Sequence, residues 1–179
     1  LVQLVRDHLP WPSSMRIRVR VDDARTVLDG RPEGSADLII LDVFNGAQTP
    51  GSVTTVEAFR QARRVLGDQG TLVANLTDRA PWPFLARAVA GLRATFPQVI
   101  LVADPGILRG RRFGNVVLIA GPIGVDAQAL SRACAGDPWP ARVVTGADVD
   151  SLVGGRAPFR DGDASGSPEP PRNLLGGRR

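Results

Sequence analysis

The stretch "ADLIILDVFNG", residues 36–46, decides the fold class of this chain. Its centre, residues 38–43, is apolar except for Asp42, and Pro50 and Gly51 then break the chain. A short, continuous apolar run of this kind is typical of a central parallel strand that is covered on both faces. We therefore expect a buried strand that places the carboxylate of Asp42 where the chain leaves the sheet.

Helical and strand patterns alternate around this stretch. Residues 17–21 alternate between apolar side chains and arginine, as in a strand with one covered face, and residues 70–76, 99–103 and 115–120 are further apolar runs. Amphipathic helices are predicted between them, one of them beginning at a capping box over residues 54–57. This order predicts the α/β class, with a doubly wound, mostly parallel, Rossmann-like sheet.

Composition sets the number of domains. A chain of 179 residues with 43% hydrophobic content can form one domain with a real core, but hardly two. From about residue 154 the sequence becomes rich in Gly, Pro, Ser and charge. Such a segment buries too little apolar area to offset the entropy of ordering it. We expect a domain over residues 1–153 and a disordered tail over residues 154–179.

Several classes of protein are disfavoured by composition. No window approaches 18 uninterrupted apolar residues and no signal peptide is readable, so a cytoplasmic protein without a membrane partner is the default expectation. The only cysteine is Cys134 and the only histidine is His8, which leaves no basis for a disulfide, a His-based triad or a metal site built on these residues. We therefore expect no metal cofactor.

The charge pattern does not favour nucleic-acid binding, although the net charge is +4. All 22 basic residues are arginines, and they are dispersed among acidic residues, while tyrosine is absent. One local cluster, Arg109, Arg111 and Arg112, has two readings. It could hold an acidic ligand, or it could decorate a solvated hairpin.

Acidic residues follow two of the predicted strands. Asp42 closes the most apolar strand, and Asp23, with Asp22 as the weaker candidate beside it, follows the preceding one. In a doubly wound sheet both places lie at the edge where ligands bind. A carboxylate there could accept a hydrogen bond from an adenine amine or hold an ammonium group, or it could simply cap the next loop or helix. Asn75, near the end of a later strand, could also reach this edge.

The order of five segments resembles the spermidine synthase-like family, which has the class I S-adenosylmethionine-dependent methyltransferase fold. These segments are "VRVDDARTVL", "ADLIILDVFNG", "TTVEAF", "GTLVANL" and "GRRFGNVVLIAG", and the resemblance covers residues 1–153. It implies transfer of an aminopropyl group from decarboxylated S-adenosylmethionine to a polyamine such as putrescine, leaving methylthioadenosine. The oligomeric state, including a homodimer, is left open.

The resemblance also assigns residues to roles. Asp23 and Ala24 match an Asp-Gly or Asp-Ala pair that contacts the adenine end of the nucleoside, and Asp42 matches the acidic residue beside the reacting centre. A carboxylate there would orient and deprotonate the attacking amine. Asn45 stands where spermidine synthases carry a second aspartate, and an amide can bind the amine but cannot take its proton. The implied catalytic residues are Asp42 and Asn45, and the implied nucleoside contacts are Asp23, Ala24 and Asp42.

The N-terminus departs from the family pattern. Family members begin with a strand, a Gly-rich loop and a second strand, and the helix expected from residue 1 resembles the one that follows these elements. We therefore expect the first two strands to be missing, and a fragment that could be inactive. Two alternatives remain: a small-molecule methyltransferase that uses S-adenosylmethionine, and a non-catalytic binding domain of the same fold.

Overall fold

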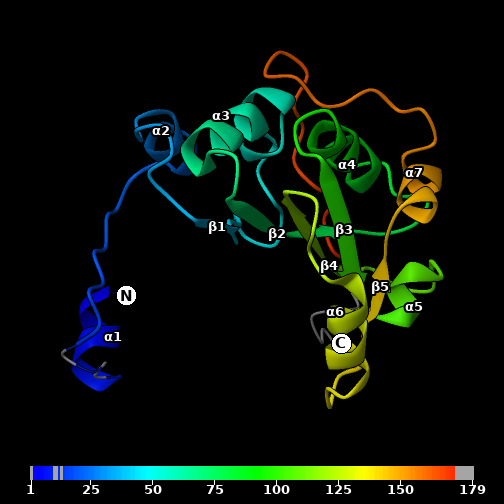
Figure 1. Ribbon diagram of the computed structural model, residues 1–179, viewed down its shortest axis with the longest axis horizontal. Coiled ribbons are helices and arrows are strands. Elements are labelled where there is room, and N and C mark those ends of the chain that lie inside the picture. The colour runs from blue at the N-terminus through cyan, green and yellow to red at the C-terminus, as the bar shows by residue number, and fades with distance from the viewer. Residues whose placement is uncertain (1, 10–11, 13, 172–179) are drawn as a thin grey trace.

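A computed structural model of the chain describes residues 2–9, 12 and 14–171 (Figure 1). The elements are α1 (Val2–His8), α2 (Ala24–Asp29), β1 (Leu38–Leu41), a 3-10 turn (Gly51–Val53), α3 (Val56–Leu66), β2 (Thr71–Asp78), α4 (Leu85–Arg93), β3 (Gln98–Ala103), α5 (Pro105–Leu108), β4 (Gly114–Gly121), α6 (Ala127–Ala135), β5 (Arg142–Val144) and α7 (Ala147–Val153). Helices and strands alternate, which confirms the α/β class.

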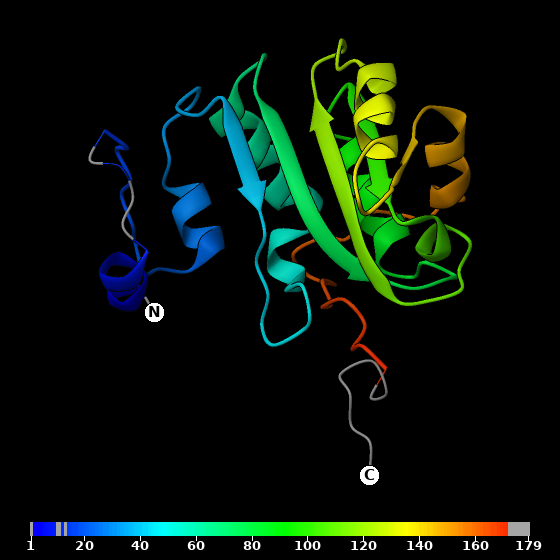
Figure 2. The same cartoon turned by 90° about the horizontal axis from the view of Figure 1, so that it is seen from below.

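The five strands form one sheet in the order β1-β2-β4-β3-β5. Only β1 and β2 pair in parallel, whereas β4 runs antiparallel to both of its neighbours and β5 runs antiparallel to β3 (Figure 2). The expectation of a mostly parallel sheet was therefore wrong for the strand pairings. The reason is that β4 follows β3 after a connection too short for a parallel crossover, so β4 returns between β2 and β3 in the opposite direction.

Helices α3 and α4 lie on the same side of the sheet, and α6 lies on the other side (Figure 1). The core lies between the sheet and helices α3 and α4. There Phe59, Leu85 and Leu92 contact Leu76 and Leu118 of the central strands. The N-cap of α3 is Thr55, whose hydroxyl accepts a hydrogen bond from the amide of Ala58, so the capping box predicted from Thr54 is displaced by one residue.

The N-terminal part differs from the prediction. Residues 17–21 were predicted to be a strand, but they form no strand in the structure. Their apolar side chains are exposed, with exposed fractions from 39% at Val19 to 94% at Val21. No strand of the described chain pairs with them, and an isolated strand has no hydrogen-bonded ladder to hold it. Strand β1 is consequently an edge strand. On one face of β1, Leu38 is 53% exposed and Ile40 is 67% exposed. Strand β1 is therefore not the central strand, covered on both faces, that we expected.

The C-terminal segment also differs from the expected disordered tail. Phe159 is 2% exposed within the core, and Ser167 is fully buried. Ser167 accepts a hydrogen bond from the amide of Thr49 at 2.9 Å, and its hydroxyl lies 2.9 Å from that of Thr77. A segment without regular secondary structure is therefore packed onto the domain by a few anchoring side chains. Residues 172–179 lie outside the described residues.

Candidate functional site

Strand β1 delivers Asp42 to the carboxyl edge of the sheet. Asp42 directly follows Leu41, the last residue of β1, and is exposed. Because Leu41 pairs with Ala74 of the parallel strand β2, the next residue of each strand lies side by side. Asn75 donates a hydrogen bond from Nδ2 to Oδ1 of Asp42 at 3.0 Å. The structure thus fixes the orientation of a carboxylate with an amide from the neighbouring strand, and it brings Asn75 to the site as expected.

The carbonyl oxygen of the Asn75 amide lacks a hydrogen-bond partner among the described residues. Oδ1 of Asn75 is buried and accepts no hydrogen bond from any residue in the described part of the chain. A buried acceptor without a donor costs free energy, on the order of 1–3 kcal/mol. The pair therefore combines two kinds of oxygen, a charged one on the exposed Asp42 and a neutral, buried one on Asn75. Both accept hydrogen bonds from an amine or ammonium group.

Asp23 lies at the N-terminus of α2. Its carboxylate accepts a hydrogen bond from the amide of Thr26 at 2.9 Å, and this bond is the main reason that the pKa of Asp23 lies below its usual range. This is the geometry of an N-cap. In this structure the carboxylate is directed to its own helix, which is the capping role that the sequence left open.

A cavity of about 390 Å³ lies between α2, β1 and α3. Ala24 and Asp22 line it from one side, and Leu41 and Val43, which flank Asp42 in the sequence, line it from the other. Most of the remaining lining is apolar, with Arg20 as one of the few polar contributions. A volume of this size with apolar walls and a few polar groups is typical of a small-ligand site.

Asn45 lies in a tight turn beyond Asp42. Its backbone amide donates to the carbonyl of Gln48 at 2.8 Å, and the amide of Gln48 donates back at 3.2 Å. Asp23, Asn45 and Asp42 itself are not among the residues that line the cavity; only the neighbours of Asp42, Leu41 and Val43, are. The structure therefore brings Ala24 to the same cavity as Leu41 and Val43, whereas Asp42, Asp23 and Asn45 stand outside its lining.

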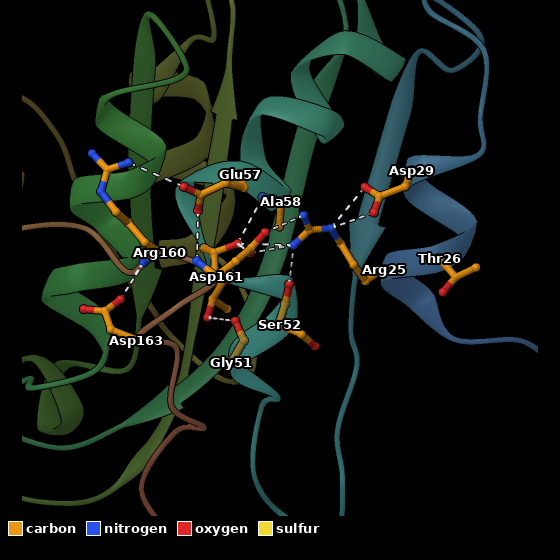
Figure 3. A network of polar contacts seen from close by, with 12 residues as sticks. Arg25, Thr26, Asp29, Gly51, Ser52, Glu57, Ala58, Arg160, Asp161 and Asp163 are labelled. Atoms are coloured by element: carbon orange, nitrogen blue, oxygen red, sulfur yellow. Dashed lines mark hydrogen bonds and ion pairs between the residues drawn. The ribbon is translucent and has the colours of Figure 1, made fainter.

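Arg25 is a residue of this region that the sequence did not single out. Its guanidinium forms two hydrogen bonds to Asp161, at 2.9 and 3.0 Å, and donates to the carbonyl of Ser52 at 3.1 Å (Figure 3). It also pairs with Asp29 within α2. The hydrogen bond to Asp161 is the main reason that the pKa of Arg25 is raised. Because Arg25 follows Ala24 directly, these contacts fix the position of the helix that forms one wall of the cavity.

No signal in the sequence identified this contact, because Arg25 and Asp161 are far apart along the chain. Asp29 alone, four residues after Arg25, has the spacing of a helical ion pair. Asp161 also accepts a hydrogen bond from the hydroxyl of Thr55 at 2.7 Å. One carboxylate of the C-terminal segment therefore joins the first turn of α2 to the N-terminus of α3.

The described residues contain neither a metal-binding cluster nor a membrane-spanning helix. Within residues 2–9, 12 and 14–171, no group of three or more His, Cys, Asp or Glu side chains has the arrangement of a metal site. In the same residues, no helix combines the length and the apolar character needed to cross a membrane.

Comparisons with solved structures identify the fold. The chain is similar to the crystal structure of a probable spermidine synthase from Corynebacterium glutamicum, with 34% sequence identity and a TM-score of 0.81 over 95% of this chain. It spans 62% of the length of that structure. A human methyltransferase-like protein 13, solved in complex with SAH, shares the fold at 16% identity, with a TM-score of 0.53 over 89% of this chain and 69% of that one.

No protein-family model and no curated protein matches the chain. The two structural likenesses nevertheless agree with each other: the chain has a class I methyltransferase-like fold, as the resemblance of its sequence implied.

Proposed function

We propose that this chain is part of a transferase that moves an aminopropyl group from decarboxylated S-adenosylmethionine to a polyamine such as putrescine. The observation that carries the proposal is the pair of Asp42 and Asn75 at the carboxyl edge of the sheet, joined at 3.0 Å. The 34% identity to a probable spermidine synthase supports a transferase fold related to S-adenosylmethionine. Cytoplasmic polyamine biosynthesis is the setting that this proposal implies.

The chemistry of the acceptor suits these two side chains. The attacking amine must lose a proton before its lone pair can bond to the propyl carbon that the sulfonium carries. As the new C–N bond forms, the C–S bond breaks, its electrons return to sulfur, and methylthioadenosine leaves. Asp42 would take up the proton, and Oδ1 of Asn75 would accept a hydrogen bond from the same amine and aim it in line with the breaking bond.

The donor would occupy the cavity beside Ala24. Its apolar walls, with Ala24 on one side and Leu41 and Val43 on the other, suit a purine ring. Asp23, once released from its cap or through its second oxygen, would accept a hydrogen bond from the adenine amine. Asn45 would bind the far end of the amine acceptor as a neutral partner.

Calorimetry on the full chain separates this proposal from its alternatives. We expect saturable binding of methylthioadenosine and none of S-adenosylhomocysteine, because an aminopropyl donor lacks the carboxylate that the methyl donor carries. Binding of S-adenosylhomocysteine alone would instead assign the chain to the small-molecule methyltransferases. Binding of neither would overturn both enzymatic functions and leave a non-catalytic domain.

A single substitution then tests the role of Asp42. With methylthioadenosine present, Asp42→Asn should weaken putrescine binding by about ten- to a hundredfold, the size expected for losing one hydrogen bond to a charged group. The matched control is Asp37→Asn, an exposed carboxylate that precedes the same strand. Equal effects of the two substitutions would show that only the net charge of the chain matters.

A further inference from the structure

A second cavity, of about 570 Å³, lies at the edge of the sheet where β2 ends and β4 begins. Its walls come from the loop after β2, the loop before β4 and the C-terminal segment around Pro168. Gly114, the first residue of β4, pairs with Asp78, the last residue of β2, so both loops leave the sheet at the edge where Asp42 follows β1. The cavity is thus separate from the one beside Ala24 but opens at the same end of the sheet.

Within the described residues, three arginines and no acidic residue line this second cavity. Arg79 comes from the loop after β2, and Arg111 and Arg112 come from the loop before β4. Arg112 pairs with Asp104 at 2.6 Å. Among the ion pairs of residues 2–9, 12 and 14–171, none involves Arg79 or Arg111, so neither guanidinium is held by a carboxylate in the described part of the chain.

The loop after β2 is held rigidly by a buried carboxylate. Asp78 is fully buried and accepts hydrogen bonds from the amides of Arg79, Phe84 and Leu85 at 2.7, 3.0 and 2.7 Å. Within the loop, Trp82 has a φ of +64°, a left-handed conformation that is costly for a bulky residue. Such strain persists only where the surrounding contacts impose it, so the position of Arg79 is set by the fold.

The second loop is fitted closely against the first. Gly110 has a φ of +70°, and a Cβ atom added there would lie 2.7 Å from the Cβ atom of Ala80. Only glycine allows this approach. The amide of Arg111 donates to the carbonyl of Gly106 at 3.0 Å, which anchors the residue after the glycine. The backbones that carry Arg79 and Arg111 are therefore brought together by contacts that leave little freedom.

We propose that this second cavity binds a small molecule through an oxyanion group, a phosphate or a carboxylate. The planar guanidinium presents paired donors that match two oxygens of such a group, and a concave site lined by one sign of charge concentrates the opposite charge. Arg79 and Arg111 bind the group directly, and Arg112 is held beside them by Asp104. Of the two readings of the arginine cluster, ligand binding thus applies to Arg111 and Arg112, whereas Arg109 lies outside the cavity lining and decorates the surface.

Calorimetry of the full chain with inorganic phosphate and with succinate, without any nucleoside, tests the proposal. Arg79→Gln and Arg111→Gln should each weaken binding by about tenfold or more, as expected for losing a charge-assisted hydrogen bond. The control, Arg109→Gln, removes the same charge two residues from Arg111, outside the cavity, and should leave binding unchanged. The stronger of the two probes identifies the source of the oxyanion.

Two results would overturn the proposal: no saturable binding of either anion up to millimolar concentration, or an equal loss in Arg109→Gln. A further variant, Gly110→Ala, should weaken binding by pushing the two loops apart, and circular dichroism checks that it is folded. Since no nucleoside is used, the outcome does not depend on whether the chain transfers an aminopropyl group.

Discussion

Two segments without helix or strand, residues 14–23 and residues 156–167, flank the domain and differ sharply in how they pack. In the first, the apolar side chains of Ile17 and Val21 are 41% and 94% exposed. In the second, Phe159 is 2% exposed and Ser167 is fully buried. Irregular backbone is common to both, so the difference lies in what their side chains contact.

The C-terminal segment has an aromatic anchor. The ring of Phe159 packs against that of Phe84, with 5.4 Å between centroids, and the guanidinium of Arg87 lies over the Phe159 ring at 4.0 Å. Arg87 also pairs with Asp163 at 2.5 Å. A large buried ring, together with the ion pair beside it, offsets the entropy of ordering a short segment. Alternating apolar residues that face no other surface do not offset it.

The largest effect should come from removing this anchor. Phe159→Ala should lower the free energy of unfolding by about 3–5 kcal/mol, because it loses the buried ring and leaves a cavity. Urea unfolding followed by tryptophan fluorescence measures it. The contrasting variant, Val21→Ala, should change stability by no more than about 0.5 kcal/mol. Similar losses in both would erase the distinction between the two segments.

A smaller effect is expected at Asp161. Hydrogen bonds from Arg25 and then from Thr55 hold the pKa of Asp161 below its ordinary value. A lowered pKa contributes stability that is present above the unfolded pKa, about 3.9, and is lost as the pH falls through the folded value. Asp161→Asn should therefore be less stable than the parent at pH 7, by up to about 1 kcal/mol for a pair whose side chains are 20% and 50% exposed, and the two should converge in acid.

Urea unfolding as a function of pH measures this difference, and Asp37→Asn serves as the control without an ion pair in the described residues. A difference between the parent and Asp161→Asn that stays constant down to the lowest pH would exclude the carboxylate charge as its cause.

The smallest effect belongs to the N-terminal segment. Ile17→Ser and Val19→Ser should each change the free energy of unfolding by no more than about 0.5 kcal/mol, because both side chains are already exposed. The midpoint of thermal unfolding should therefore stay nearly unchanged. Losses above about 1 kcal/mol at either position would show that this segment packs against the domain in solution, and the contrast with residues 156–167 would then fail.

Local patterns predicted the central elements well. The apolar runs at residues 70–76, 99–103 and 115–120 correspond to β2, β3 and β4, because strands that are buried leave a continuous apolar signal. The same signal misled at residues 38–43, where one face of β1 is exposed. An apolar run shows that a strand can be buried on both faces. Which elements pack against those faces depends on the tertiary structure of the whole chain.

The candidate site was predicted in part. The position of Asp42 at a strand end followed from the sequence, and so did the reach of Asn75. The cap formed by Asp23 was foreseen only as an alternative to ligand binding. The contact of Arg25 with Asp161 could not be predicted, since a salt bridge between distant residues leaves no periodic pattern in either of them.

The sequence by itself determined the α/β class, the buried strands and the place of an aspartate at a strand end, because each depends on side chains close together along the chain. Tertiary structure alone decided the direction of β4 between β2 and β3, the anchoring of Phe159, and the meeting of Arg79 with Arg111 around one cavity. These features depend on contacts between residues that are distant in the sequence. Such contacts stabilise the fold only after the chain has closed the loops between them.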